Sequence, residues 1–341
     1  MAVTIQQIAD HVGVSRGTVD RALNHRGRIN PEVAEMIQRT AEELGYVHRP
    51  RRRQDKAGGR KKIGIVTQLS KASFMIAVRR GIQTVKKELE ERGAEVLIKE
   101  IESVNAADQL EAIDELLGEG IHGLAIMPVD DELIRAKLNE LTEERKIPVV
   151  TFNSDIVGTK RICFVGMDNK RSGQAAAGLL GMLTRGKGKV LIITGHFSSL
   201  LNNSRVDGFV EEVKAVFPEL EIAGVQGSFN DAGEVEHIIE NTLESISGIN
   251  GIFIVSGGQE GIGAAFKNLA LSQRPYVVVY DQTRHNEELL REGTVDFLID
   301  QNGFEQGYRP PRILLDFLQK GEMPKEEYLY TGIDIKTKYN L

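Results

Sequence analysis

The chain has 341 residues, of which 41% are hydrophobic and 27% charged, and this indicates a globular protein with two or three domains. No apolar run approaches the ~20 residues of a membrane span. The N-terminal MAVTIQQIADHVGVS has no basic start and no uninterrupted apolar stretch, so we expect no secretory signal. With a single cysteine, Cys163, these features predict a cytoplasmic protein that does not contact a membrane.

The net charge of −6 is unevenly distributed along the chain. Residues 1–62 hold 13 Lys/Arg and 7 Asp/Glu, so this part carries +6 and the remaining residues carry −12. A basic head on an acidic body suggests that only the head meets a polyanion such as DNA.

Three short helices are predicted within residues 1–46. The first covers about residues 5–11, and a tight turn follows at 12–14. The second begins after Ser15, whose hydroxyl can accept a hydrogen bond from a first-turn amide, and it ends near residue 23. The third begins at Asn30-Pro31-Glu32, which supplies a capping side chain, a proline at the first helical position and an acid at the positive end of the dipole.

The outward face of the second predicted helix has the chemistry to read base edges. Arg16, Gly17 and Asp20 lie opposite its apolar positions, with Arg21 at the edge. Arg can donate two hydrogen bonds to guanine, and Asp can accept one from cytosine. Singly, the two arginines also fit ordinary surface charges, but the three-helix context favours DNA. The predicted DNA-binding residues, phosphate contacts included, are Thr4, Ser15, Arg16, Gly17, Thr18, Asp20, Arg21, Asn24 and His25.

The helical pattern stops after residue 46. The segment VHRPRRRQDKAGGRKK, residues 47–62, holds eight Lys/Arg, one Pro and a Gly pair, which is typical of a linker. It fits a solvated tether and equally a tether that also touches DNA phosphates.

Residues 63–341 alternate between short apolar runs and amphipathic stretches. This pattern predicts an α/β fold of buried parallel sheets with helices on both faces. Ligands of such sheets bind beyond the carboxyl ends of the strands, so the residues after each strand deserve inspection. The strand candidates are 62–66, 94–98, 123–127, 148–152, 189–194, 221–225, 251–255 and 276–280.

The stretch from TIQQIADHVGVSRGTVDRALN to the third helix ending in ELGY resembles the head of lactose-repressor (LacI-type) regulators over about 45 residues. Two departures stand out. Asp20 occupies a place where the family usually has Ser, which suggests an unusual operator. The linker lacks the Ala-Arg-x-Leu stretch that forms a leucine-bearing hinge helix in family members, so a basic arm that follows the DNA backbone is the alternative.

The body resembles the periplasmic sugar-binding fold, in particular its ribose-binding branch. The landmarks TQLSKASF, TFNSD, NNSRVDGF, VVVYDQT and FLIDQNG occur in the order of that fold. Where the ribose branch has Asn-Asp, this chain has Gly257-Gly258, so that Gln259 substitutes or the pocket is larger. The resemblance implies a polyol or carbohydrate effector held by charge-assisted hydrogen bonds and an aromatic face. The implied effector-binding residues are Ser73, Phe74, Asn153, Ser154, Arg205, Gln259, Asp281 and Gln301.

These features predict an all-α helix-turn-helix head (1–46), a linker (47–62) and a two-lobed effector-binding and dimerisation body (63–341). Lobe 1 is expected at about 63–160 and 301–328, and lobe 2 at about 161–300 and 329–341. The resemblance implies a homodimeric repressor on a two-fold symmetric operator in double-stranded DNA.

An enzyme and a transport receptor are the alternatives. The glycines of SGGQEGIG do not make a dinucleotide fingerprint, and no catalytic elbow or metal-spaced His pair is present in the sequence. A transport receptor would have no use for a helix-turn-helix. We therefore expect no catalytic residues, no metal and no cofactor.

Overall fold

The protein is described from a computed structural model that covers residues 4–23, 29–44, 46 and 60–341, with the side chain of Asp20 left out. The chain divides into two compact units, and the boundary between them falls between residues 59 and 60 of the sequence. We call them the head and the body and describe each by itself. The predicted contacts Asn24 and His25 and most of the basic linker lie outside the described residues.

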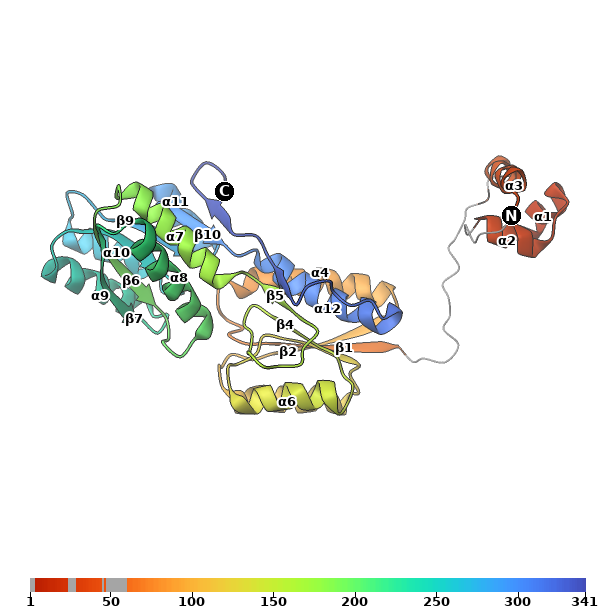
Figure 1. Ribbon diagram of the computed structural model, residues 1–341, viewed down its shortest axis with the longest axis horizontal. Helices are drawn as coiled ribbons and strands as arrows, with labels where there is room; N and C mark the ends of the chain where they lie inside the picture. Colours follow the sequence, from red (N-terminus) through yellow and green to blue (C-terminus); the bar gives the residue numbers. More distant parts are fainter. Residues whose placement is uncertain (1–3, 24–28, 45, 47–59) are drawn as a thin grey trace. The chain divides into compact units, whose positions relative to one another are not determined.

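The head consists of α1 (Ile5–Val12), α2 (Arg16–Leu23) and α3 (Pro31–Glu43) (Figure 1). Thr4 caps α1 by accepting a hydrogen bond from the amide of Gln7, whose side-chain oxygen accepts one from the amide of Thr4 in return. Gly13 ends this helix at a φ of 74°, a left-handed conformation that glycine adopts without steric cost. A small core fixes the three helices against one another, and it consists of Ile8, Ala9, Val19, Ala22, Ile37 and Ala41.

The body contains two lobes, each built on a six-stranded sheet. The sheet of lobe 1 has the order β11-β5-β4-β3-β1-β2, and all its pairings are parallel. Helices α4 and α12 cover one face of it, and α5 and α6 cover the other. Its elements are β1 (Lys61–Thr67), α4 (Met75–Glu91), β2 (Ala94–Glu100), α5 (Ala106–Gly118), β3 (Gly123–Ile126), α6 (Glu132–Glu143), β4 (Val149–Phe152), β5 (Cys163–Gly166), α12 (Gly303–Lys320) and β11 (Tyr328–Tyr330).

Lobe 2 repeats this plan with the strand order β12-β10-β9-β8-β6-β7, in which only β12 is antiparallel to its neighbour. Helices α7 and α8 cover one face, and α9, α10 and α11 cover the other. Its elements are α7 (Asn169–Leu183), β6 (Gly188–Thr194), α8 (Leu200–Val216), β7 (Leu220–Gly227), α9 (Ala232–Ser245), β8 (Ile249–Ile254), α10 (Gly261–Leu269), β9 (Tyr276–Tyr280), α11 (Arg284–Glu292), β10 (Phe297–Asp300) and β12 (Asp334–Lys336).

Three crossovers join the lobes, and they follow β5, β10 and β11. Thr331 connects all three. Its amide donates a hydrogen bond of 2.8 Å to the carbonyl of Gly166, and its hydroxyl donates one of 3.0 Å to the carbonyl of Gln301. Because each crossover leaves a parallel strand at its carboxyl end, the carboxyl edges of the two sheets face each other. We call this region the interlobe edge.

Three boundaries differ from the sequence prediction. Strand β5 and the whole of β11 belong to lobe 1, so the chain leaves that lobe after Gly166 and Tyr330 rather than after 160 and 328. The reason is that these short strands pair with each other, Tyr328 beside Phe164. The linker also ends earlier than predicted, since Lys61 and Lys62 already form part of β1.

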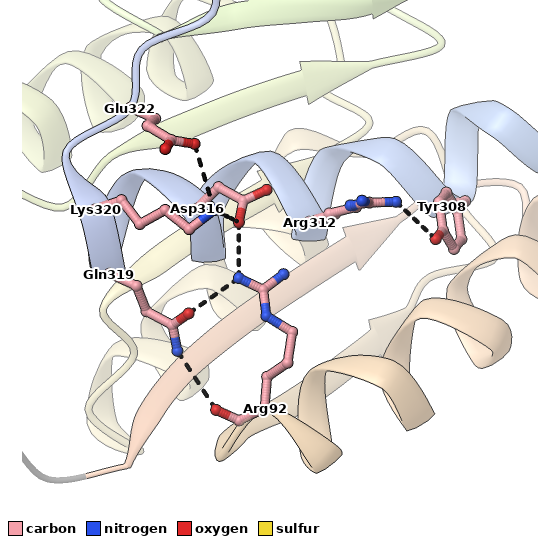
Figure 2. A network of polar contacts seen from close by, with 7 residues as sticks. All are labelled: Arg92, Tyr308, Arg312, Asp316, Gln319, Lys320 and Glu322. Carbon is pink, nitrogen blue, oxygen red and sulfur yellow. Dashed lines mark hydrogen bonds and ion pairs between the residues drawn. The ribbon is translucent and has the colours of Figure 1, made fainter. Parts of the chain in front are cut away.

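Polar contacts tie α12 to the end of α4 (Figure 2). The guanidinium of Arg92, which caps α4, donates hydrogen bonds of 2.7 Å to Asp316 and 3.0 Å to Gln319. At the other end of the same helix pair, the carbonyl oxygen of Val78 would lie 2.0 Å from a Cβ placed on Gly307, so only glycine allows this close approach. These contacts hold α12 against α4 at both ends, and the Gly307 contact lies near the start of α12, where the second crossover enters it.

Candidate functional site

The exposed face of α2 is the DNA-reading candidate in the head. Val19 and Ala22 are buried against α1 and α3, which leaves Arg16, Gly17 and Arg21 exposed. The Nε of Arg21 donates a hydrogen bond of 3.1 Å to the carbonyl of Gly17, which holds the guanidinium along the first turn of its own helix. This face can therefore present guanidinium donors to base edges in a major groove.

The hydroxyls predicted to contact DNA also have structural partners. Ser15 accepts a hydrogen bond of 3.2 Å from the amide of Thr18, and the two hydroxyls lie 2.9 Å apart. Thr4 caps α1, as described above. These groups therefore organise the helix starts, where first-turn amides are suited to bind phosphate.

In the body, Arg205 on α8 is the most buried of the predicted ligand contacts, with 2% of its surface exposed. Glycine makes this position possible, because a Cβ on Gly173 of α7 would lie 2.0 Å from the carbonyl oxygen of Arg205. Nε, Nη1 and Nη2 of Arg205 donate hydrogen bonds of 2.9, 3.0 and 3.0 Å to Asn169 Oδ1, the carbonyl of Val255 and Gln301 Oε1. Burial lowers the pKa of Arg205 from its usual value.

Two other predicted contacts, Gln301 and Asp281, lie beside this guanidinium. Gln301 accepts from Arg205 and donates through Nε2 to the carboxylate of Asp281. Asp281 directly follows β9 with a φ of 73°, and burial raises the pKa of its carboxyl. The ring of Tyr280 lies beneath the guanidinium, with 3.9 Å from the ring centroid to Cζ. Burial raises the pKa of Tyr280 to about 12, and its hydroxyl is 2.7 Å from that of Ser172.

Gln259, whose role as a ligand contact stays a prediction, is held by the backbone of its own loop. Its side-chain amide donates hydrogen bonds of 2.6 Å to the carbonyl of Ser256 and 3.4 Å to that of Tyr280. The residue is buried. Its amide nitrogen therefore stabilises the loop after β8 by bonding to backbone carbonyls. Gly257 and Gly258 in the same loop have no side chains that could contact a ligand.

Lobe 1 contributes a mainly amide and hydroxyl surface. Asn153, at a φ of 62° after β4, donates a hydrogen bond of 3.0 Å to Gln306 on α12. Ser154 donates one of 2.7 Å to the carbonyl of Pro128 and accepts one from Gln68. The side-chain oxygen of Gln68 is buried and has no partner among the described residues, so it remains as an acceptor.

Gln306 joins the two sets of residues. It is fully buried, it accepts from Asn153 in lobe 1, and its Nε2 donates a hydrogen bond of 2.7 Å to the carbonyl of Gln301. A chain of contacts therefore runs from Asn153 through Gln306 and Gln301 to Arg205, across the second crossover.

Ser73 and Phe74 lie outside this chain of contacts. Ser73 is exposed, and Phe74 is the half-buried residue that precedes α4. The Phe74 ring packs against the start of α12, where a Cβ on Gly303 would lie 2.9 Å from Cε2.

The sequence analysis did not predict several residues of this region, namely Gln68, Asn169, Phe197, Phe229 and Gln306. Gln68, Phe197 and Phe229 come one to three residues after β1, β6 and β7, so the rule that ligands bind after strands already pointed to them. Asn169 and Gln306 lie in first turns of helices after crossovers, and no local signal marks them. Among the described residues, no group of His, Cys, Asp or Glu is arranged to hold a metal ion, and no helix has the length and apolar character needed to cross a bilayer.

The head has the arrangement of a helix-turn-helix DNA-binding domain, and the body is a two-lobed binding-protein fold. Two protein-family matches agree with this description of the head and the body. Residues 63–323 match the periplasmic binding protein domain, and residues 4–48 match the bacterial regulatory proteins of the lacI family. The chain belongs to the periplasmic binding protein domain family and carries a lacI-type regulatory head, as its motifs predicted.

The relatives include regulators and sugar-binding proteins. The chain is 28% identical to the maltose regulon regulatory protein MalI and 24% identical to the lactose operon repressor, both of Escherichia coli (strain K12). Each alignment covers 61% of this chain but 58% and 55% of the relative, so the chain spans little more than half the length of these curated relatives. The solved structure of GanP, a glucose-galactose binding protein from Geobacillus stearothermophilus, has a TM-score of 0.75 and 21% identity over 83% of this chain and 99% of that one. This last likeness shows the fold alone.

Proposed function

We propose that the protein is a sequence-specific DNA-binding transcriptional regulator, a repressor, whose operator affinity is controlled by a small sugar-like or polyol effector bound between the lobes. The observation that carries this proposal is Arg205, a buried guanidinium at the carboxyl edge of a parallel sheet, in a chain that begins with a helix-turn-helix. A transcriptional role requires no catalysis, and we expect no enzymatic activity.

The donor inventory of Arg205 supports a polar ligand. A guanidinium has five N–H donors, and three of them have partners among the described residues. Two donors therefore remain for hydroxyl or carboxylate oxygens. The Asp281 carboxylate supplies acceptors beside them, and neighbouring hydroxyls of a polyol can bond to both groups with charge-assisted hydrogen bonds.

The crossovers supply a route from effector to DNA. Thr331 joins all three crossovers, and Gln306 connects polar residues of both lobes. An effector that contacts both lobes favours one angle between them and so changes how the two heads of a homodimer are held. Two heads would read two half-sites of a two-fold symmetric operator. By linkage, the effector and the operator change each other's affinity by the same factor.

The test uses the full chain. A binding site is selected from random double-stranded DNA, and operator affinity is then measured with and without a panel of sugars, polyols and sugar phosphates. We expect a two-fold symmetric consensus and at least one sugar or polyol that weakens operator binding. A chain that selects no sequence, or whose operator affinity no compound of the panel changes, would contradict the proposal.

A further inference from the structure

Gln306 is the polar exception on the buried face of α12. The other buried positions of this helix hold glycine, proline or leucine, whereas Gln306 is a glutamine with 0% of its surface exposed. A buried amide costs free energy unless its oxygen and its nitrogen both find hydrogen-bond partners. Here Oε1 accepts from Asn153, and Nε2 donates to the carbonyl of Gln301. These two partners indicate what the side chain does in the fold.

The carbonyl oxygen of Gln301 is held from the side of lobe 1 by two hydrogen bonds. Nε2 of Gln306 donates one of 2.7 Å and the hydroxyl of Thr331 donates one of 3.0 Å, so both lone pairs of the oxygen are used. Gln306 is itself bonded to Asn153 after β4, and the amide of Thr331 is bonded to Gly166 at the end of β5. The main chain at the second crossover is therefore tied to lobe 1.

The side chain of the same Gln301 is tied to lobe 2. Its Oε1 accepts a hydrogen bond of 3.0 Å from Arg205, and its Nε2 donates to the carboxylate of Asp281. Only 4% of the surface of Gln301 is exposed, so water does not readily replace these partners. A rotation of one lobe against the other must therefore displace either the carbonyl or the side chain of Gln301 from its partners.

We propose that Gln306 is the positioning residue that makes the angle between the lobes depend on the Arg205 site. This inference rests on the proposed function, in which an effector binds Arg205 and Asp281. Such an effector changes the hydrogen bonds that these two residues make to the side chain of Gln301. While Gln306 holds the Gln301 carbonyl to lobe 1, that displacement turns one lobe against the other. Without Gln306 the main chain at the crossover absorbs the displacement, and effector and operator no longer change each other's affinity.

Gln109 on α5 provides a matched control. It is also a glutamine with 0% of its surface exposed, and both ends of its amide are bonded. Nε2 donates a hydrogen bond of 2.9 Å to the carbonyl of Met127, and Oε1 accepts one of 2.8 Å from the amide of Val129. All three residues belong to lobe 1. Gln109→Met and Gln306→Met therefore remove the same kind of buried amide, but only the second substitution affects a crossover.

The first measurement needs no effector. Spin labels are attached to the full chain at Val157→Cys in lobe 1 and Val216→Cys in lobe 2, where the native side chains are 75% and 53% exposed, in a Cys163→Ala background. Double electron–electron resonance then gives the distribution of distances between the lobes. An excess of unlabelled chain restricts the signal to pairs within one chain. The compared chains are the labelled parent, Gln306→Met and Gln109→Met.

We expect Gln306→Met to give a distribution at least about twofold wider than the parent, because the lobes then sample several angles. Gln109→Met should give the width of the parent. Thr331→Val removes the other hydrogen bond to the Gln301 carbonyl without changing α12, and it should widen the distribution as well. It keeps the test decisive if Gln306→Met does not fold. An unchanged width in the variants that fold, or equal widening by Gln109→Met, overturns the inference.

The second measurement concerns transmission to DNA. Operator affinity is titrated with and without D-ribose, D-xylose, D-glucose and D-galactose, and calorimetry follows sugar binding. For a sugar that weakens operator binding by the native chain, Gln306→Met should bind the sugar but bring the ratio of the two operator affinities to about one, as loss of coupling requires. Gln109→Met should keep the native ratio. A native ratio in Gln306→Met overturns the inference and leaves the proposed function in place. If no compound of the whole panel changes operator binding by the native chain, the proposed function fails and the transmission fails with it, while the distance distributions separately decide whether Gln306 fixes the lobe angle.

Discussion

Nη2 of Arg205 donates a hydrogen bond of 3.0 Å to the side-chain oxygen of Gln301, which lies 96 residues further along the chain. Arg205 belongs to α8, and Gln301 follows β10 at the crossover into lobe 1. The same Gln301 donates to Asp281 and receives a hydrogen bond from Gln306 on its carbonyl. A change at the guanidinium therefore reaches the connection between the lobes through a single residue.

Replacement of Arg205 should separate effector sensing from DNA binding. In Arg205→Ala the ligand's polar groups lose their donors in a desolvated site, a cost of about 1–3 kcal/mol or more. We expect the effector response to be abolished or strongly weakened, while operator binding without effector survives. Operator titrations with and without effector measure both. Arg274→Ala is the control. Arg274 precedes β9 and pairs with Asp296, which precedes β10, so both residues lie at the amino ends of these strands, away from the carboxyl ends near Arg205.

Unchanged effector potency in Arg205→Ala would show that the effector does not bind Arg205. Loss of operator binding as well would show that Arg205 holds the lobe together. Asp281→Asn, which keeps the shape of the side chain and removes its charge, then tests the same ligand contacts with less disturbance of the fold.

The close contact of α7 with α8 predicts opposite effects for two glycines of one helix. A Cβ on Gly173 would lie 2.0 Å from the carbonyl of Arg205, whereas a Cβ on Gly178 would meet nothing within 4 Å. Gly173→Ala should lower the free energy of unfolding by about 1–3 kcal/mol through overpacking. Gly178→Ala should raise it by about 0.5–1 kcal/mol, because alanine favours a helix interior. Urea unfolding of the two variants decides this, and equal effects would contradict the close contact.

Arg21 on the exposed face of α2 should contribute to sequence reading. Arg21→Ala should cost roughly 1–3 kcal/mol on the selected operator and much less on random DNA, because a bidentate base contact is lost only on the operator. Arg39→Ala removes the same charge from an exposed position on α3 and serves as the control. Competition titrations on both DNAs provide the measurement. Equal losses for Arg21→Ala on operator and random DNA would make it a phosphate contact.

The buried thiol of Cys163 predicts a pH dependence of stability. Burial raises the pKa of Cys163 from 9.0 to about 11. Between these two values the unfolded chain loses the proton and the folded chain keeps it, so the free energy of unfolding falls as pH rises. The full effect is roughly 3 kcal/mol, at 1.36 kcal/mol per pKa unit. From pH 8 to 10, the free energy of unfolding should decline more steeply for the native chain than for Cys163→Ala. Parallel curves for the two chains would contradict the raised pKa.

The sequence by itself determined the elements whose signals are local. Thr4, Ser15 and Asn30 stand at the starts of the three head helices and cap them with their own side chains, as the residue types indicate. Apolar runs such as 189–194 and 276–280 are strands because a run of that length is buried on both faces of a parallel sheet. The motifs of the head and the landmarks of the body resemble two families, and the comparisons confirmed both.

The tertiary structure alone decided the features that depend on partners distant in the chain. Helix α12 continues through Pro310 and Pro311, which would locally favour an end, because both prolines are buried in a helix packed on α4. The strand β11 has only three residues, Tyr328–Tyr330, which is too short to be predicted from its pattern, and it exists through its pairing with β5. Arg205 is identifiable in the sequence as a candidate, but its three hydrogen-bond partners come from different elements. Which donors remain for an effector is settled only when the folded chain brings these elements together.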